Sequence, residues 1–129
     1  MGEFKDGDRD GKGSHTTNDG GIYVGEFKND EYNGQGTLIT HGGGKYVGQF
    51  KDGRPNGEGI LTSADGDIYE GQLRATKPHG QGTFIMADGQ KIVGEWKDGE
   101  IWNGTVADSD GKIYRKFTNG KYKVVYNYD

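Results

Sequence analysis

The feature that most constrains this sequence is an internal repeat with a period of 23 residues. Tyr23, Tyr46 and Tyr69 are separated by this period, and a glycine follows each of them two positions later. A phenylalanine or leucine comes two positions after that glycine, and an Asn-Gly-x-Gly or His-Gly-x-Gly motif follows further along the unit. A unit this short is one supersecondary element, which buries its apolar side only against neighbouring units.

The glycines follow the same period. Of the 26 glycines, 19 fall in four recurring columns, so most of the glycine belongs to the repeat and not to linkers. Hydrophobic residues make up only 29% of the chain, which argues against a large globular core. The absence of cysteine excludes disulfides and thiolate metal sites. Two prolines are too few for a collagen triple helix.

The pattern within one unit predicts a β-hairpin. Tyr46–Phe50 alternates with period two and is rich in residues that favour strands. Lys51–Asn56 has the composition of a turn, and Gly57–Leu61 alternates again as a second strand. The tyrosine, glycine and phenylalanine of the first strand then share one face, because successive side chains of a strand point to opposite faces.

Glycine inside a strand weakens it, because glycine has no side chain to pack. Since the glycines share a face with the aromatic residues, we expect a ring from one strand to lie over a glycine of its neighbour. One hairpin alone is marginally stable, so the hairpins must stack. The sequence therefore predicts an all-β fold, an elongated, twisted, single-layer antiparallel sheet of stacked β-hairpins with turns along its two edges.

The repeat register makes the chain one array. We expect a partial unit at 1–22, units at 23–45, 46–68 and 69–91, an irregular unit at 92–113, and a C-terminal capping hairpin at 114–129. Because the sequence begins in the middle of a unit, an unpaired edge strand is predicted near residues 2–6. Such an edge favours self-pairing, or indicates a fragment of a longer array.

The motif Tyr-x-Gly-x-Phe/Trp-x-x-Gly-x-x-x-Gly-x-Gly resembles the MORN repeat (membrane occupation and recognition nexus), best in units 46–68 and 69–91. The resemblance covers roughly residues 1–113 and weakens where Ile92 replaces tyrosine and Val106 replaces glycine. It implies a non-catalytic stacked-hairpin scaffold for protein–protein interaction or self-assembly. The family also implies two alternatives, an anionic phospholipid-binding module and an accessory domain of a larger enzyme such as a lipid kinase or SET-domain methyltransferase.

Two sets of aromatic residues are candidates for contact with a partner. The first is the predicted aromatic–glycine face, with Tyr23, Phe27, Tyr46, Phe50, Tyr69 and Trp96. This face either packs internally or accepts a peptide, a strand or a second copy of the chain. The second set is Tyr32 and Trp102, which occupy turn columns filled elsewhere by Pro55 and Pro78, so we expect both to be accessible to solvent.

The C-terminal segment is basic. Residues 112–129 carry a net charge of +4 and the rest of the chain −8, which gives the overall −4. Tyrosines interleave with the cations, and the anionic-lipid candidates are Arg115, Lys116, Lys121 and Lys123. Two interpretations stay open, a polar hairpin that caps the last sheet edge and a contact with an anionic phospholipid surface. A nucleic acid is not expected as a partner.

One acidic run is similar to the start of a calcium-binding EF-hand loop. Asp6, Asp8 and Asp10 alternate and are followed by Gly11. The loop needs a bidentate glutamate at its twelfth position, where this chain has Thr17. The run also falls in the turn column of the first unit, so we expect a solvated turn.

The three histidines predict no catalytic or metal site. His15, His41 and His79 occupy different columns of the repeat, and His79 stands where other units have asparagine. We therefore expect no metal, no cofactor, no catalytic residue and no small-molecule substrate. The expected partner is another protein or a second copy, in the cytoplasm or at the periphery of a membrane.

Overall fold

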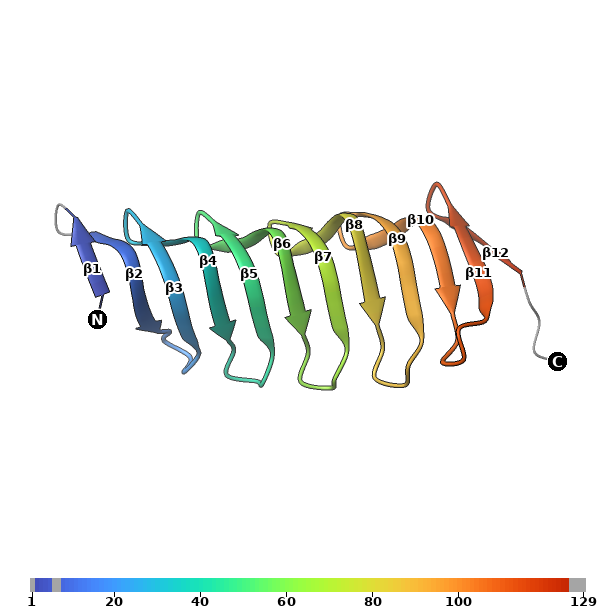
Figure 1. Ribbon diagram of the computed structural model, residues 1–129, viewed down its shortest axis with the longest axis horizontal. Helices are drawn as coiled ribbons and strands as arrows, with labels where there is room; N and C mark the ends of the chain where they lie inside the picture. Colours follow the sequence, from blue (N-terminus) through green and yellow to red (C-terminus); the bar gives the residue numbers. More distant parts are fainter. Residues whose placement is uncertain (1, 6–7, 126–129) are drawn as a thin grey trace.

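In the computed structural model, which describes residues 2–5 and 8–125, the chain forms one sheet (Figure 1). Within these residues, twelve strands follow one another in sequence order, and neighbouring strands are antiparallel. The strands are β1 (Gly2–Lys5), β2 (Asp8–Thr16), β3 (Ile22–Lys28), β4 (Glu31–Ile39), β5 (Lys45–Lys51), β6 (Arg54–Thr62), β7 (Ile68–Arg74), β8 (Lys77–Ile85), β9 (Lys91–Lys97), β10 (Glu100–Ala107), β11 (Ile113–Thr118) and β12 (Lys121–Val124). The predicted all-β array of hairpins is confirmed. No helix in these ranges is long and apolar enough to cross a bilayer.

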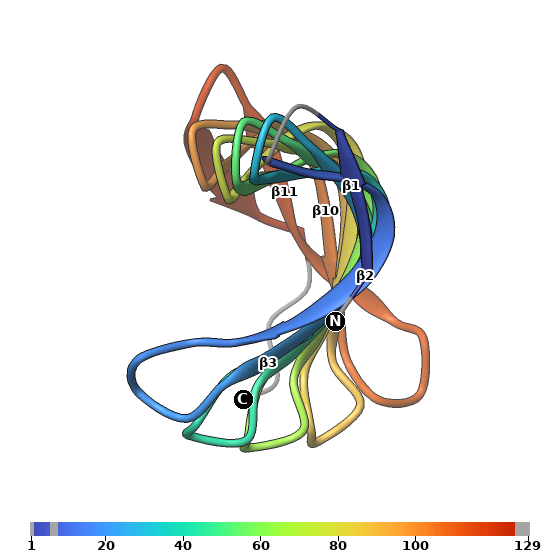
Figure 2. The same ribbon diagram turned by 90° about the vertical axis from the view of Figure 1, so that its left-hand side faces the viewer.

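Two rows of turns run along the two long edges of the sheet (Figure 1). From β3 onward, tight turns join each odd-numbered strand to the next, and longer return turns lie along the opposite edge. The end-on view shows that the strands are strongly bent, so the sheet curves about its long axis (Figure 2). In the described part of the chain, β1 pairs with β2 alone and β12 with β11 alone. The predicted edge strand near residues 2–6 is therefore present as β1.

The tight turns are shorter than the sequence predicted. Both central residues of each described turn have positive φ, as a type I′ hairpin turn requires; they are Asn29-Asp30, Asp52-Gly53, Ala75-Thr76, Asp98-Gly99 and Asn119-Gly120. The predicted turn over Lys51–Asn56 is wrong, because the strand resumes at Arg54 and Pro55 pairs with Phe50. Proline is tolerated here because the ladder between β6 and β7 begins only at Gly57, so Pro55 lies outside it and its missing N–H breaks no bond to β7. The carbonyl of Pro55 accepts the N–H of Thr76 at 3.0 Å.

A bulge bends the hairpins at a recurring place. The register of β5 and β6 shifts between Gly48 and Phe50. Across this bulge β6 therefore contains more residues than the facing part of β5. Gln49 Oε1 accepts the N–H of Glu58 at 2.9 Å and satisfies a donor that the ladder leaves free. The equivalent glutamate or glutamine side chain also accepts a backbone N–H in the β3–β4 and β7–β8 hairpins. The polar residue that lies between the repeat glycine and the repeat aromatic residue therefore stabilises the bulge of its hairpin.

The tight turns are hydrogen bonded to the hairpins that precede them. The Asn56 side chain accepts the N–H of Ala75 at 3.3 Å, and Asn103 does the same for the terminal turn at 3.0 Å. His79 Nδ1 accepts the N–H of Asp98 at 3.2 Å. His79 therefore takes the place of asparagine, as the sequence predicted, but it lies in strand β8 and not in a turn, and its side chain holds the turn of the next hairpin.

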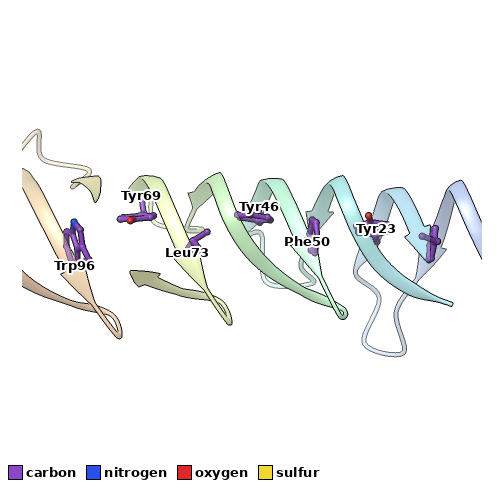
Figure 3. Packing of buried hydrophobic residues seen from close by; sticks show 7 residues of the cluster. Tyr23, Tyr46, Phe50, Tyr69, Leu73 and Trp96 are labelled. Carbon is purple, nitrogen blue, oxygen red and sulfur yellow. The ribbon is translucent and has the colours of Figure 1, made fainter. Parts of the chain in front are cut away.

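The core is a row of buried side chains along one face of the sheet (Figure 3). Rings of successive units meet edge to face. Tyr23 and Phe50 have their centroids 5.0 Å apart, and those of Tyr69 and Trp96 are 5.6 Å apart. Each ring contact therefore joins one unit to the next, which is how an array with so few aliphatic residues coheres.

Candidate interaction surfaces

The aromatic–glycine face, predicted as one candidate contact surface, is the core itself. Its six candidate residues each expose at most 6% of their surface: Tyr23, Phe27, Tyr46, Phe50, Tyr69 and Trp96. Internal packing, the first of the two roles left open by the sequence, is therefore the role these side chains have. A partner cannot reach them without opening the sheet, so the contact role has to be sought on another surface.

The core tyrosines are held by their hydroxyl groups as well as by their rings. Tyr46 Oη donates a hydrogen bond to the carbonyl of Gln49 at 2.8 Å, and its ring lies against Gly59. A Cβ on Gly59 would lie closer than 3.0 Å to three atoms of that ring. Burial raises the pKa of Tyr46, and likewise of Tyr23 and Tyr69, to about 12. The expectation that rings cover glycine backbone is confirmed.

The opposite face carries exposed branched aliphatic side chains. Val24 and Val47 follow the buried tyrosines in sequence and are 55% and 41% exposed. One cross-strand row runs Val24, Thr37, Val47, Ile60, since each of these residues is the register partner of the next. We call this surface the aliphatic face, and its exposed members are Ile22, Val24, Ile39, Val47, Ile60 and Val93.

The sequence contains a signal for the aliphatic face that the repeat analysis missed. The residue after the repeat tyrosine or isoleucine is Val24, Val47, Glu70 or Val93. Three of these four are β-branched and apolar, at positions where the alternation puts them opposite the core. Glu70 interrupts the column, so a charged residue is compatible with this position of the fold.

Tyr32 contributes a second layer to the core. Its ring stacks on Tyr23 with the centroids 3.7 Å apart and the planes 9° from parallel. Its hydroxyl is 2.8 Å from His15 Nδ1. Tyr32 is therefore half-buried and fixed on both sides, and it offers a partner less surface than the sequence led us to expect.

Comparison with protein families agrees with this geometry. The MORN repeat model matches the chain four times, at residues 1–22, 23–45, 46–68 and 69–91. These matches cover more than half of the 129 residues. The chain belongs to the MORN repeat family. No curated protein is significantly similar to it. The fold and the family together are those of a repeat scaffold module.

Trp102 does not occupy the MORN column that the sequence suggested. Ile101 pairs with Trp96 and so takes the position that Pro55 holds in the β5–β6 hairpin. Between Ile101 and Gly104, which pairs with Gly94 as Gly59 pairs with Gly48, β10 has two residues where β6 has three, so Trp102 lies in a shortened bulge. Its half-buried ring lies beside Lys97, with the ammonium 4.6 Å from the ring centroid. Its predicted alignment with the prolines is therefore wrong. Val106 pairs with Ile92 as Leu61 pairs with Tyr46, so the expectation that Val106 replaces a repeat glycine is wrong as well.

The four basic candidates of the last hairpin of the MORN array fall on two faces. Lys116 and Lys123 are register partners, and Lys121 shares their face because it lies two positions before Lys123. Arg115 points to the other side, where its guanidinium lies 4.7 Å from the ring centroid of Tyr122. All four cations are exposed. The three lysines thus form one basic surface, and Arg115 is not part of it.

The acidic run near the N-terminus does not form a calcium loop in the described residues. Asp8–Thr16 is strand β2, whereas an EF-hand loop encircles its ion. Asp6 lies outside the described residues. Within the ranges that the structure describes, no three His, Asp or Glu side chains are placed to hold a metal ion.

Proposed function

We propose that this MORN array is a non-catalytic scaffold that binds another protein, or a second copy of itself, through its aliphatic face. The observation that supports the proposal is the exposed row of branched side chains on β3 to β6. Val24, Val47 and Ile60 each leave more than 40% of their surface in water although they are adjacent across the strands. Contiguous exposed apolar residues of this kind are typical of interaction surfaces.

The shape of the sheet favours a binding role for this face. The core is confined to the opposite side, so the aliphatic side chains contribute little to folding and are free to contact a partner. β-branched side chains lose little conformational entropy when a partner covers them, because their rotamers are already restricted. The rigid ladder of backbone hydrogen bonds keeps the row in place.

Capture experiments with the double variant Val24→Glu/Val47→Glu test this proposal. The variant copies the glutamate that stands naturally at Glu70, so we expect the fold to be retained, which circular dichroism checks. A partner that the wild-type protein captures and the variant loses, identified by mass spectrometry, supports the proposal. Sedimentation velocity over a range of concentrations tests the second copy. Equal capture by both proteins, together with a monomer in both samples, would contradict it.

A second candidate function is the binding of an anionic phospholipid surface. The observation in its favour is the exposed lysine face of the last hairpin, where Lys116 and Lys123 are register partners and Lys121 lies beside them. Like charges directly opposite one another destabilise a hairpin, so an anionic ligand would relieve the repulsion. Each lysine near such a surface contributes about 1 kcal/mol to binding.

Co-sedimentation with phosphoinositide-containing liposomes tests this candidate. We expect binding that weakens as salt rises and that disappears in Lys121→Glu/Lys123→Glu. The matched control pair is Lys116→Glu and Arg115→Glu, because these two single variants make the same charge change on opposite sides of β11. Binding that does not depend on salt, or that Arg115→Glu weakens equally, would argue against a lipid site on the lysine face.

A further inference from the structure

The residues that flank the tight turns form register pairs across the hairpins. In three hairpins the pair joins a basic and an acidic residue: Lys5 with Asp8, Lys28 with Glu31, and Lys97 with Glu100. The two central hairpins differ, because both members are basic: Lys51 pairs with Arg54, and Arg74 pairs with Lys77. Like charges at directly opposed positions destabilise a hairpin, so this pairing opposes folding.

Little in the structure neutralises these four cations. Arg74 lies 3.0 Å from a carboxylate oxygen of Asp98, and both side chains are about 60% exposed, so this pair is well solvated. Lys51, Arg54 and Lys77 are exposed, and in the described part of the chain none of them forms an ion pair. The four side chains therefore form a positive cluster, which we call the central cation cluster.

Three of the four residues of the central cation cluster, Lys51, Arg54 and Arg74, line a shallow pocket on the tight-turn edge of the sheet. The pocket lies between two successive turns and is lined by Lys51, Asp52, Arg54, Asn56, Arg74 and Ala75. The turn before it carries Asp30 and Glu31, and the turn after it carries Asp98 and Glu100. The positive surface is thus only two hairpins wide and has acidic residues on both sides.

Because acidic residues flank the positive surface, a narrow anionic ligand fits it better than a broad anionic surface. A planar anionic membrane that approached this edge would meet the acidic turns together with the cations. A single extended peptide would avoid those acidic turns and would meet the four cations, with Asp52 as the single carboxylate that lines the pocket. Equivalent positions in successive hairpins are two strands, or about 10 Å, apart. In a polyproline II segment every third residue points the same way and lies about 9 Å further along, which matches that spacing.

We propose that Lys51, Arg54, Arg74 and Lys77 bind an extended acidic segment of a partner protein, which lies across the two central tight turns. Carboxylates of the segment would pair with the guanidinium groups of the two arginines and with the lysine ammonium groups. Binding would also relieve the repulsion within each hairpin. The central hairpins are the ones in which two cations face each other beside the tight turn, whereas the last hairpin pairs Thr118 with Lys121. A local rule that is broken in this way is typical of a functional site. This site is separate from the aliphatic face.

Fluorescence anisotropy with a labelled synthetic peptide tests the proposal. The peptide has glutamate at every third position between prolines and serines, and the titration is done at about 0.15 M salt, where long-range attraction is screened. We expect saturable binding to the wild-type protein. The variant Arg54→Glu/Lys77→Glu gives the central hairpins the basic–acidic pairing of their neighbours. It should therefore keep or raise the melting temperature while the peptide affinity falls about tenfold or more.

The matched control is Lys116→Glu/Lys123→Glu, which makes the same change in net charge at the far end of the array. We expect it to change the peptide affinity by less than about twofold, as for distant independent sites. The proposal is overturned if the wild-type protein shows no saturable binding, or if the control loses as much affinity as the test variant. It is also overturned if inositol hexakisphosphate or phosphoinositide vesicles bind and the peptide does not. Val24→Glu/Val47→Glu should bind the peptide normally, which separates this result from that of the aliphatic face.

Discussion

The ring of Tyr46 lies directly against the backbone of Gly59 on the neighbouring strand, and the tyrosine hydroxyl donates to the carbonyl of Gln49 in its own strand. The same relationship joins the tyrosine of β3 to a glycine of β4 and the tyrosine of β7 to a glycine of β8. A single-layer sheet has no second layer to cover its core. Here the bend of the sheet and the missing side chain of glycine let the ring be buried by its own layer.

This contact predicts that Gly59→Ala destabilises the protein strongly. The added Cβ would overlap the Tyr46 ring, and neither the ring nor the backbone of β6 can move without breaking the ladder. Overpacking of this kind costs about 3 kcal/mol. Urea unfolding followed by circular dichroism measures the loss. Gly42→Ala is the control, because no atom lies within 4 Å of the position of its Cβ, and its stability should match that of the wild-type protein. Equal stability of the two variants would contradict the ring–glycine account.

The packing of aromatic rings on glycines could be predicted from the sequence, because the two residue types recur at alternate positions that point to the same face of the sheet. Two other features could not. The alternation of side chains shows that Tyr46 and Val47 point to opposite faces of the sheet. It does not show which of the two faces becomes buried when the sheet bends. Composition also gives Pro55 as a turn residue, whereas the turn has only two residues and Pro55 takes a strand position outside the β6–β7 ladder. Both features depend on how neighbouring strands pair and bend together, which the pattern within one unit does not contain.

The core tyrosines predict unfolding at alkaline pH. Burial raises the pKa of Tyr23, Tyr46 and Tyr69 from the ordinary 10.0 to about 12. The folded protein therefore keeps protons that the unfolded chain releases. The stability is complete below about pH 10 and is lost as the pH rises toward 12, at about 1.4 kcal/mol per tyrosine and pH unit. Urea midpoints measured across this range, together with phenolate absorbance, check the prediction.

The control for the alkaline transition is the triple variant Tyr23→Phe/Tyr46→Phe/Tyr69→Phe. Each substitution removes one hydroxyl hydrogen bond and should cost about 1 kcal/mol at neutral pH. The stability of the variant should then depend much less on pH between 10 and 12. If these tyrosines ionise near pH 10 while the wild-type protein stays folded, they are not buried as described.

His79 predicts an asymmetry between two substitutions. Its Nδ1 accepts the N–H of Asp98, the role that the side chains of Asn56 and Asn103 have in their own turns. His79→Asn should therefore keep the stability of the wild-type protein, whereas His79→Ala leaves the N–H of Asp98 without this acceptor and costs about 1 kcal/mol. Urea denaturation of the three proteins distinguishes these outcomes. If asparagine and alanine are equally destabilising, the hydrogen bond does not stabilise the turn.

The turn between β7 and β8 predicts that Thr76→Gly stabilises the protein. Thr76 has a φ of 76°, a left-handed conformation that is unfavourable for a β-branched residue by roughly 1–2 kcal/mol. Gly53 occupies the equivalent position of the preceding turn with a φ of 84° and has no such strain. We therefore expect Thr76→Gly to raise the free energy of unfolding by about 1 kcal/mol, and Gly53→Thr to lower it by a similar amount. Thermal unfolding measures both changes, and a shift of the same sign in the two variants would show that the backbone of these turns relaxes around the side chain.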